Sequence, residues 1–182
     1  MVRLVTEDVR GRNKVLEIAA GTGLVTIEVV KVVSELTATD LSPDMLSILS
    51  TRLAENNHAN VQTEIADVMS LQYSDQTFDA VIAANILHLL PDLPGALRQI
   101  RRVLKPDGIL CVPTFAHGQS PWTQVVSRAM AVVGFPVVAR FDGESFQKVL
   151  QENGFEVINE RIVPGLLPIV HVTAKPMEGW KE

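Results

Sequence analysis

The stretch at residues 13–31, NKVLEIAAGTGLVTIEVVK, decides the fold that this sequence predicts. Its apolar run VLEI predicts a strand, Gly21 and Gly23 predict a tight turn, and the apolar residues that follow predict a helix. The glycines have no Cβ atom, so the backbone bends easily there and a ligand can lie against the main chain. An acid inside an apolar strand is costly to bury without a partner. We therefore expect Glu17 to face a polar ligand or N–H donors in a cleft beyond this strand.

Length and composition are typical of one globular domain covering residues 1–182, with 47% hydrophobic and 20% charged residues. The balance of 16 basic against 21 acidic residues gives a net charge of −5, which argues against a nucleic-acid partner. The single cysteine, Cys111, excludes an intrachain disulfide and favours a reducing compartment. The first 13 residues are too polar for a signal peptide, and the longest uncharged apolar stretch, 129–139, is shorter than the ~20 residues that span a bilayer. We therefore expect a cytoplasmic protein with no integral membrane segment.

Strands alternate with helices in the predicted order of elements. Further strands are expected at 35–39, 61–66, 78–84, 109–113, 155–163 and 167–173, and helices at 43–56, 94–104 and 144–153. Helix-length connections between strands favour right-handed crossovers and a parallel sheet. Only about four residues, 164–167, join the last two strands, so that pair is expected to be antiparallel.

These elements predict an α/β fold. We expect a doubly wound, mostly parallel seven-stranded sheet with one antiparallel strand near the C-terminus, in three α/β/α layers. The strand at 61–66 is expected near an edge, and 105–108 reads as a turn because of its Pro and Gly. Residues 1–12 show no clear periodicity and are expected to form a loose lead-in.

Three acids fall at or near the carboxyl ends of successive strands: Glu17, Asp40 and Asp67. In a doubly wound sheet these ends line one crevice. Asp40 follows Gly23 by 17 residues, the spacing at which a nucleotide site places a carboxylate on ribose hydroxyls. Asp67 would then reach an exocyclic amine, and Glu17 the polar end of the ligand. A dinucleotide fingerprint would need a third glycine near Thr26, so a ligand with a ribose, an adenine and a positive centre fits better.

Five motifs in order resemble the class I S-adenosylmethionine-dependent methyltransferases, and the small-molecule ubiquinone/menaquinone branch in particular. They are LEIAAGTG at 16–23, DLSPDML at 40–46, ADV at 66–68, FDAV at 78–81 with NILH at 85–88, and LKPDGIL at 104–110. The resemblance covers more than half of the chain. It implies a Rossmann-like methyltransferase fold with S-adenosylmethionine as the cofactor.

The resemblance also implies which residues contact the cofactor. Gly21 and Gly23 would lie against its methionine part, and Asp40 would hold the ribose. The remaining contacts would come from Leu41 and Met45 to the adenine, Asp67 and Val68 to its amine and ring edge, and Asn85 near the amino acid end. Ala19 stands where the family usually has glycine, which would reduce affinity. The family usually carries a lid helix or more before the first strand, and only 13 residues precede Lys14 here, so this lid is expected to be short or missing.

Catalysis would then depend on alignment of a small-molecule acceptor with the electrophilic methyl group, without a metal. His88, just beyond the fourth strand, is the first candidate for a general base; the alternative is a histidine that only packs or caps a helix. His117, after the fifth strand, is the second, with a plain loop histidine as its alternative. The segment 114–142 is apolar and variable. It is expected to form either a substrate-side wall, which implies an apolar acceptor, or a core or homodimer contact.

The sequence therefore predicts a methyltransferase of small molecules that uses S-adenosylmethionine. An alternative is a non-catalytic cofactor-binding or scaffold subunit that works with a partner chain. A nicotinamide-dependent oxidoreductase is disfavoured by Thr26 and by the reversed strand.

Overall fold

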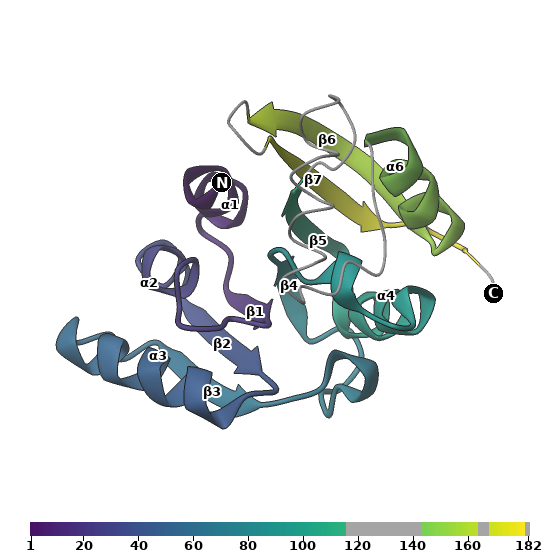
Figure 1. Cartoon of the computed structure of the whole chain (residues 1–182). Helices are drawn as coiled ribbons and strands as arrows, with labels where there is room; N and C mark the ends of the chain where they lie inside the picture. Colours follow the sequence, from purple (N-terminus) through teal and green to yellow (C-terminus); the bar gives the residue numbers. More distant parts are fainter. Residues whose placement is uncertain (116–142, 164–167, 181–182) are drawn as a thin grey trace, which may run out of the picture.

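The computed structural model describes residues 1–115, 143–163 and 168–180, and helices lie on both sides of its central sheet (Figure 1). Within these residues seven strands form one sheet in the order β3-β2-β1-β4-β5-β7-β6. The strands are β1 (Lys14–Ile18), β2 (Glu35–Asp40), β3 (Val61–Ile65), β4 (Phe78–Ala83), β5 (Leu104–Phe115), β6 (Phe155–Val163) and β7 (Ile169–Pro176). The helices are α1 (Val2–Val9), α2 (Thr26–Val29), α3 (Pro43–Glu55), α4 (Leu93–Val103) and α6 (Gly143–Glu152), with 3-10 turns η1 (Val68–Ser70) and η2 (Leu87–Leu89). The predicted substrate-side segment 114–142 lies outside the described residues from 116 onward.

The predicted topology is confirmed. β1 pairs in parallel with β2 and β4, β2 with β3, and β4 with β5. β7 runs antiparallel to both of its neighbours, β5 and β6, so it is the reversed strand that the short connection predicted. β3 lies at one edge of the sheet, as its alternating sequence predicted.

The start of β5 differs from the prediction. A turn was expected at 105–108, but the strand begins at Leu104 and is irregular there, because its pairing with β4 shifts between Phe78 and Ala80. Gly108 lies inside this irregular stretch, where an added Cβ would approach the carbonyl oxygens of Lys105 and Phe78 to 3.0 and 3.2 Å. The Pro and Gly that indicated a turn instead shape a bulge in a continuing strand.

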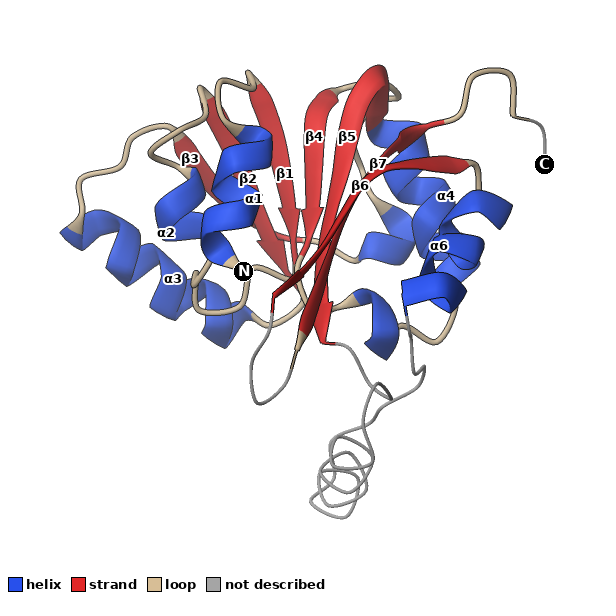
Figure 2. Cartoon of the chain, turned by 90° about the horizontal axis from the view of Figure 1, so that it is seen from above, coloured by secondary structure: helices blue, strands red, loops and turns tan. Residues whose placement is uncertain are grey.

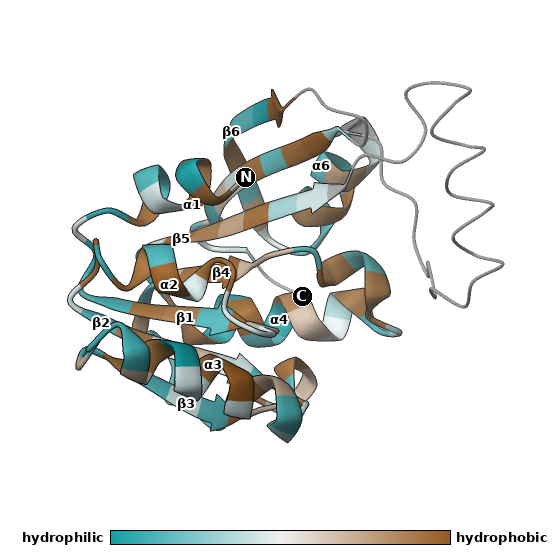
Figure 3. Ribbon diagram, turned by 60° about the vertical axis from the view of Figure 1, so that its left-hand side comes forward, coloured by the Kyte–Doolittle hydropathy of each residue, from teal (hydrophilic) through white to brown (hydrophobic). Residues whose placement is uncertain are grey.

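Helices α1, α2 and α3 cover one face of the sheet, and α4 and α6 cover the other (Figure 2). Along the ribbon, β1 and β5 carry long apolar stretches, whereas α3 alternates between polar and apolar residues (Figure 3). The largest cluster of buried residues lies between the sheet and the helices α4 and α6, and includes Leu97, Ile100 and Phe146. Two smaller clusters lie on the other face. The sheet is therefore buried on both sides, which leaves its ends for ligands.

The prediction of a loose lead-in at 1–12 was wrong, because residues 2–9 form α1. Val5 and Val9 are fully buried in a cluster that also contains Val29 of α2 and Cys111 of β5. An eight-residue helix is marginal by itself and is stabilised mainly by packing of its apolar face. Two buried positions are too few to give a clear helical period in the sequence.

A polar cluster anchors α1 to the reversed strand. Oδ2 of Asp8 lies 2.8 Å from Nε2 of His171 and 2.5 Å from Oγ1 of Thr173. Nη2 of Arg161 lies 3.6 Å from the other oxygen of Asp8. Burial of the imidazole lowers the pKa of His171, while the hydrogen bond to Asp8 acts in the opposite direction. Asp8 thus provides the partner that two buried polar groups need.

We expect Asp8→Ala to lower the free energy of unfolding by about 2 kcal/mol, because it leaves the His171 imidazole and the Thr173 hydroxyl buried without their acceptor. The matched control is Glu7→Ala, which removes an exposed ion pair to Arg161 and should cost less than about 1 kcal/mol. Urea denaturation at pH 7 measures both. Equal losses in the two variants would contradict the anchoring role of Asp8.

Candidate functional site

The turn after β1 needs both of its glycines. Gly21 and Gly23 have φ angles of 56° and 88°, in the region that glycine adopts without steric cost. A Cβ on Gly23 would lie 2.3 Å from Cδ1 of Leu49, so this position also allows α3 to pack against the turn. A Cβ on Gly21 would meet no atom within 4 Å. The main chain at Gly21 is therefore open on the side where a ligand would lie.

Ala19 begins this turn in a strained conformation. Its φ angle is 53°, which costs an L-residue with a Cβ atom roughly 1 kcal/mol relative to glycine. The next residue, Ala20, donates its N–H to the carbonyl of Thr39 in β2 at 2.8 Å. The strain is thus held by the pairing of the turn with the end of β2, and strained positions of this kind are common where a backbone meets a ligand.

Asp40 ties the glycine turn to the end of β2. Its Oδ2 accepts a hydrogen bond from the N–H of Gly21 at 2.8 Å, and its Oδ1 accepts one from the N–H of Ser42 at 2.9 Å. A carboxylate offers about four lone-pair positions, so each oxygen keeps the capacity to accept one more hydrogen bond. The carboxylate therefore holds the turn and remains able to accept from a ligand.

Helix α3 supports the same turn from outside. The Ser42 hydroxyl accepts from the N–H of Met45 at 3.3 Å, with Pro43 in the first helical turn, so the predicted N-cap is confirmed. Arg52 donates from Nη1 to the carbonyl of Thr22 at 2.6 Å. Sequence reasoning missed Arg52, since no local pattern distinguishes it from an exposed arginine in the last turn of a helix.

A hollow lies beyond the carboxyl ends of β1, β2 and β3. It is lined by Ile18, Ala19, Asp40, Leu41, Ala66, Asp67, Val68, Ile86 and Leu90. Predicted site residues are brought together here: Ala19, Asp40, Leu41, Asp67 and Val68. Sequence reasoning did not single out the remaining lining residues as site residues; of these, the apolar Ile86 and Leu90 lie after β4, on either side of η2. Most of the lining is apolar, and the carboxylates of Asp40 and Asp67 are its charged groups.

Asp67 also has a structural role at this hollow. Its Oδ1 accepts from the N–H of Met69 at 2.9 Å and so caps η1. Asp67 is exposed, while the next residue, Val68, is buried in the main core. The cap therefore fixes the orientation of both residues at the hollow.

Other predicted site residues do not line this hollow. Met45 lies on the first turn of α3 with 41% of its surface exposed. Asn85 has a φ angle of 54° and donates its N–H to the carbonyl of Pro113 at 2.9 Å. Its Oδ1 is buried and has no hydrogen-bond partner among the described residues. Gly21 and Gly23 form the adjacent turn.

Glu17 lies beneath the turn rather than in the hollow. Side chains alternate along a strand, so Glu17 shares the sheet face of Val15, which is covered by α1 and α2. Only 2% of its surface is exposed, and Oε2 has no hydrogen-bond partner in the described part of the chain. Burial raises the pKa of this carboxyl to about 8, and the nearby Thr26 hydroxyl lowers it to a smaller extent. Burial therefore favours the neutral form of Glu17 near pH 7. The expected contact of Glu17 with a ligand stays a prediction.

His88 lies in η2, after β4, and is 8% exposed. Its Nδ1 lies 3.3 Å from Oγ1 of Thr114, which is near the carboxyl end of β5. His88 therefore lies at the carboxyl ends of the central strands β4 and β5. His117 lies outside the described residues.

Comparisons with known proteins agree with this geometry. A family model described as the methyltransferase domain matches residues 15–108. The chain is 28% identical to demethylmenaquinone methyltransferase from Corynebacterium urealyticum, over 94% of this chain and 80% of the relative. It is 29% identical to the ubiquinone/menaquinone biosynthesis C-methyltransferase of Ectopseudomonas mendocina, over 92% of this chain and 75% of the relative. The crystal structure of a putative methyltransferase from Bacillus halodurans has the same fold, with a TM-score of 0.84, 16% identity and coverage of 97% and 98% of the two chains.

The family model covers more than half of the chain. The chain belongs to this methyltransferase family. It is an S-adenosylmethionine-dependent methyltransferase that acts on a small-molecule acceptor, as the sequence predicted. The alternative of a non-catalytic scaffold subunit is not favoured.

The structure of this methyltransferase fits its cofactor. The open main chain at Gly21, the remaining lone pairs of Asp40 and the apolar lining of the hollow suit a ligand with a ribose and an aromatic base. The buried Oδ1 of Asn85, which has no partner among the described residues, keeps the capacity to accept a hydrogen bond. Among the described residues, no group of His, Cys, Asp and Glu could hold a metal ion, and no helix is long and apolar enough to cross a membrane.

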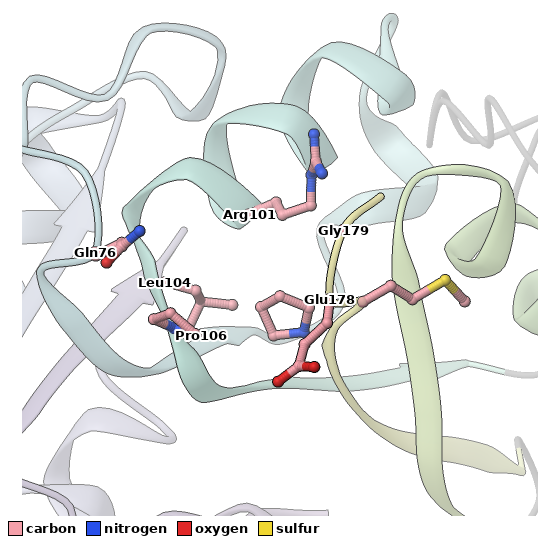
Figure 4. Close-up of a pocket in the computed structure, with 8 residues that line it drawn as sticks. Gln76, Arg101, Leu104, Pro106, Glu178 and Gly179 are labelled. Atoms are coloured by element: carbon pink, nitrogen blue, oxygen red, sulfur yellow. The ribbon is translucent and has the colours of Figure 1, made fainter. Parts of the chain in front are cut away.

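A second hollow lies at the other end of the strands, where β5 begins and β7 ends (Figure 4). Its lining includes Arg101 of α4, Leu104 at the start of β5, and Pro176 at the end of the reversed strand β7. The guanidinium of Arg101 also lies 4.1 Å from the ring centroid of Trp180. None of the predicted site residues that the structure describes lines this hollow. Ligands in open α/β sheets bind at the carboxyl ends of strands, whereas this hollow lies where β5 begins.

We expect the stability of the wild-type methyltransferase to fall as pH rises from about 4.5 to about 8. Unfolded Glu17 loses its proton near its ordinary pKa of 4.5, whereas the folded protein retains the proton up to about pH 8. Glu17→Gln cannot ionise, so it should be more stable than wild type by on the order of a few kcal/mol at pH 9 and similar at pH 4.5.

Urea denaturation across this pH range measures the effect. Glu28→Gln, which changes an exposed acid on α2, is the matched control and should follow the wild-type curve. If wild type and Glu17→Gln kept a constant difference at every pH, the neutral state of Glu17 would be refuted.

Proposed function

We propose that this methyltransferase holds S-adenosylmethionine at the carboxyl ends of β1 and β2 and methylates a reduced quinone or a related phenol. One observation carries the cofactor site: Asp40 and Asp67 line one hollow next to the open main chain of Gly21. The acceptor class is supported by the relatives, which are named as methyltransferases of demethylmenaquinone and of ubiquinone and menaquinone biosynthesis.

Asp40 is proposed to accept hydrogen bonds from the ribose hydroxyls with the lone pairs that Gly21 and Ser42 leave unused. Leu41 and Val68 would pack against the adenine, with Met45 near its outer side. The exposed carboxylate of Asp67 would accept from the exocyclic amine, since only its Oδ1 has a backbone partner. Gly21, Gly23 and Asn85 would surround the amino acid end, and Ala19 would narrow the turn.

The cofactor supplies an electrophilic methyl group on a sulfonium, and the protein supplies alignment and exclusion of water. Asp40 and the glycine turn would fix the adenosine relative to the sheet edge. His88 is the described residue that we propose to contact the acceptor, because it lies where β4 and β5 end.

A cytoplasmic location is part of this proposal. The single buried Cys111 and the net charge of −5 support a reducing compartment and a protein without a nucleic-acid partner. A homodimer remains compatible with the sequence.

We expect Asp40→Asn to weaken binding of S-adenosylhomocysteine about tenfold or more, a loss of about 1.4 kcal/mol, because the amide has one acceptor atom in place of two. Asp44→Asn changes an exposed acid on the first turn of α3 and should bind within about twofold of wild type. Isothermal titration calorimetry measures both affinities.

Turnover tests the acceptor. With S-adenosylmethionine labelled at the methyl group, wild type should methylate reduced demethylmenaquinone in preference to a simple primary amine. Wild type that binds no S-adenosylhomocysteine, or equal binding by Asp40→Asn and wild type, would contradict the cofactor site. Transfer to the amine alone would contradict the acceptor class.

A further inference from the structure

One arginine of α3 contacts the glycine turn. An added Cβ on Gly23 would lie 2.3 Å from Cδ1 of Leu49, so the absence of a side chain there lets α3 approach closely. Arg52 lies about one helical turn after Leu49, and its Nη1 donates to the carbonyl of Thr22 at 2.6 Å. Among the described residues, the guanidinium of Arg52 forms no ion pair and no other hydrogen bond. Its charge is therefore not neutralised by a neighbouring carboxylate.

Hydrogen bonds hold the peptide groups on both sides of the Gly21–Thr22 peptide. The N–H of Gly21 donates to Asp40 at 2.8 Å, and the N–H of Gly23 donates to the carbonyl of Ala20 at 3.0 Å. The Thr22 carbonyl accepts from α3, so the peptide between Thr22 and Gly23 is held at both its C=O and its N–H. The carbonyl of Gly21 and the N–H of Thr22 have no hydrogen-bond partner among the described residues. One unpaired peptide group thus lies between two that are fixed.

This unpaired peptide has the hydrogen-bonding capacity to bind an amino acid. It offers one donor and one acceptor, and the amino acid end of S-adenosylmethionine carries a carboxylate that accepts and an ammonium that donates. The main chain at Gly21 is open, because a Cβ there would meet no atom within 4 Å. The positive charge of Arg52 beside the turn also favours a carboxylate there.

We propose that Arg52 is a positioning residue for the amino acid end of S-adenosylmethionine. It fixes the Thr22 carbonyl against α3 and so holds the unpaired Gly21–Thr22 peptide in the orientation that this end of the cofactor needs. The inference rests on the proposed function, because it assumes that the cofactor lies at this turn. It assigns the two halves of the cofactor to different charged residues, Asp40 for the adenosine and Arg52 for the amino acid.

Two ligands separate these halves. S-adenosylhomocysteine and 5′-methylthioadenosine share the adenosine and a thioether sulfur, and only the first carries the amino acid. Arg52→Met keeps an apolar side chain without charge or donors, so it should weaken binding of S-adenosylhomocysteine about tenfold and change binding of 5′-methylthioadenosine less than about twofold. Arg52→Lys keeps the charge and should lose less than about threefold. Isothermal titration calorimetry of the full chain measures these affinities.

Two further variants are the controls for this titration. Arg98→Met removes an exposed arginine of α4 and should bind both ligands like wild type. Asp40→Asn should weaken both ligands, because the two share the ribose.

Kinetics provide a second readout. With reduced demethylmenaquinone as acceptor, Arg52→Met should raise the KM for S-adenosylmethionine about tenfold and leave kcat within about twofold. Such a split is expected because the amino acid end is bound equally in the ground state and in the transition state.

Amide hydrogen exchange tests the hold on the turn without any ligand. The N–H of Gly23 belongs to the same peptide as the Thr22 carbonyl, so it should exchange about tenfold faster in Arg52→Met than in wild type. The N–H of Gly154, which donates to Gln151 in another turn, should exchange at the same rate in both proteins.

Equal loss of affinity for the two ligands in Arg52→Met, or unchanged affinity for S-adenosylhomocysteine, would overturn the inference. Wild type that binds neither ligand would instead overturn the proposed cofactor site. The exchange rate of Gly23 would then still decide whether Arg52 holds the turn.

Discussion

The hydrogen bonds that Asp40 accepts from Gly21 and Ser42 join the three parts on which the site depends. They fix the glycine turn at the end of β1, the end of β2 and the start of α3 relative to one another. Other contacts reinforce the same joint: α3 packs Leu49 against Gly23 and binds the turn carbonyl of Thr22 through Arg52. Because one carboxylate both builds the turn and faces the hollow, the geometry of the site is already formed before a ligand enters.

The two faces of the sheet next to the glycine turn differ in how many polar groups they bury. Toward α4 and α6 the core is apolar up to the hollow, and His88 and Thr114 are its polar pair at the end of β5. Toward α1 and α2, two sets of polar groups are buried: the carboxyl of Glu17 beneath the turn, whose pKa is raised by burial, and the Asp8–His171 pair between α1 and β7. Buried polar groups cost free energy unless they are paired, and among the described residues Oε2 of Glu17 has no partner. This cost at the centre of the sheet is of the kind that functional sites tolerate.

The sequence predicted the order of strands, the reversed β7 and the residues at the hollow because these depend on local rules. A connection of about four residues cannot make a parallel crossover, and the Ser42–Pro43 pair marks a helix start by itself. The parts that escaped prediction depend on tertiary contacts. Helix α1 is stabilised by docking of Val5, Val9 and Asp8, and Arg52 acquires its role only because α3 lies over the turn.

The same distinction between local rules and tertiary contacts applies to the prediction of site residues. Asp40 and Asp67 were predicted from their position after strands, a rule of topology, and both line the hollow. Glu17 satisfied the same rule, yet the alternation of side chains along β1 places it under the turn, which required knowledge of which helices cover which face. The contact of His88 with Thr114, 26 residues away, was not predicted, because no motif connects the two.

The most direct measurement is a crystal structure of this methyltransferase with S-adenosylhomocysteine. The ribose hydroxyls should donate to Asp40 while Gly21 and Ser42 keep their hydrogen bonds to the same carboxylate, with the adenine between Leu41 and Val68. Adenosine bound elsewhere, for example in the hollow beside Arg101, or a ribose without contact to Asp40, would contradict the dual role of this carboxylate.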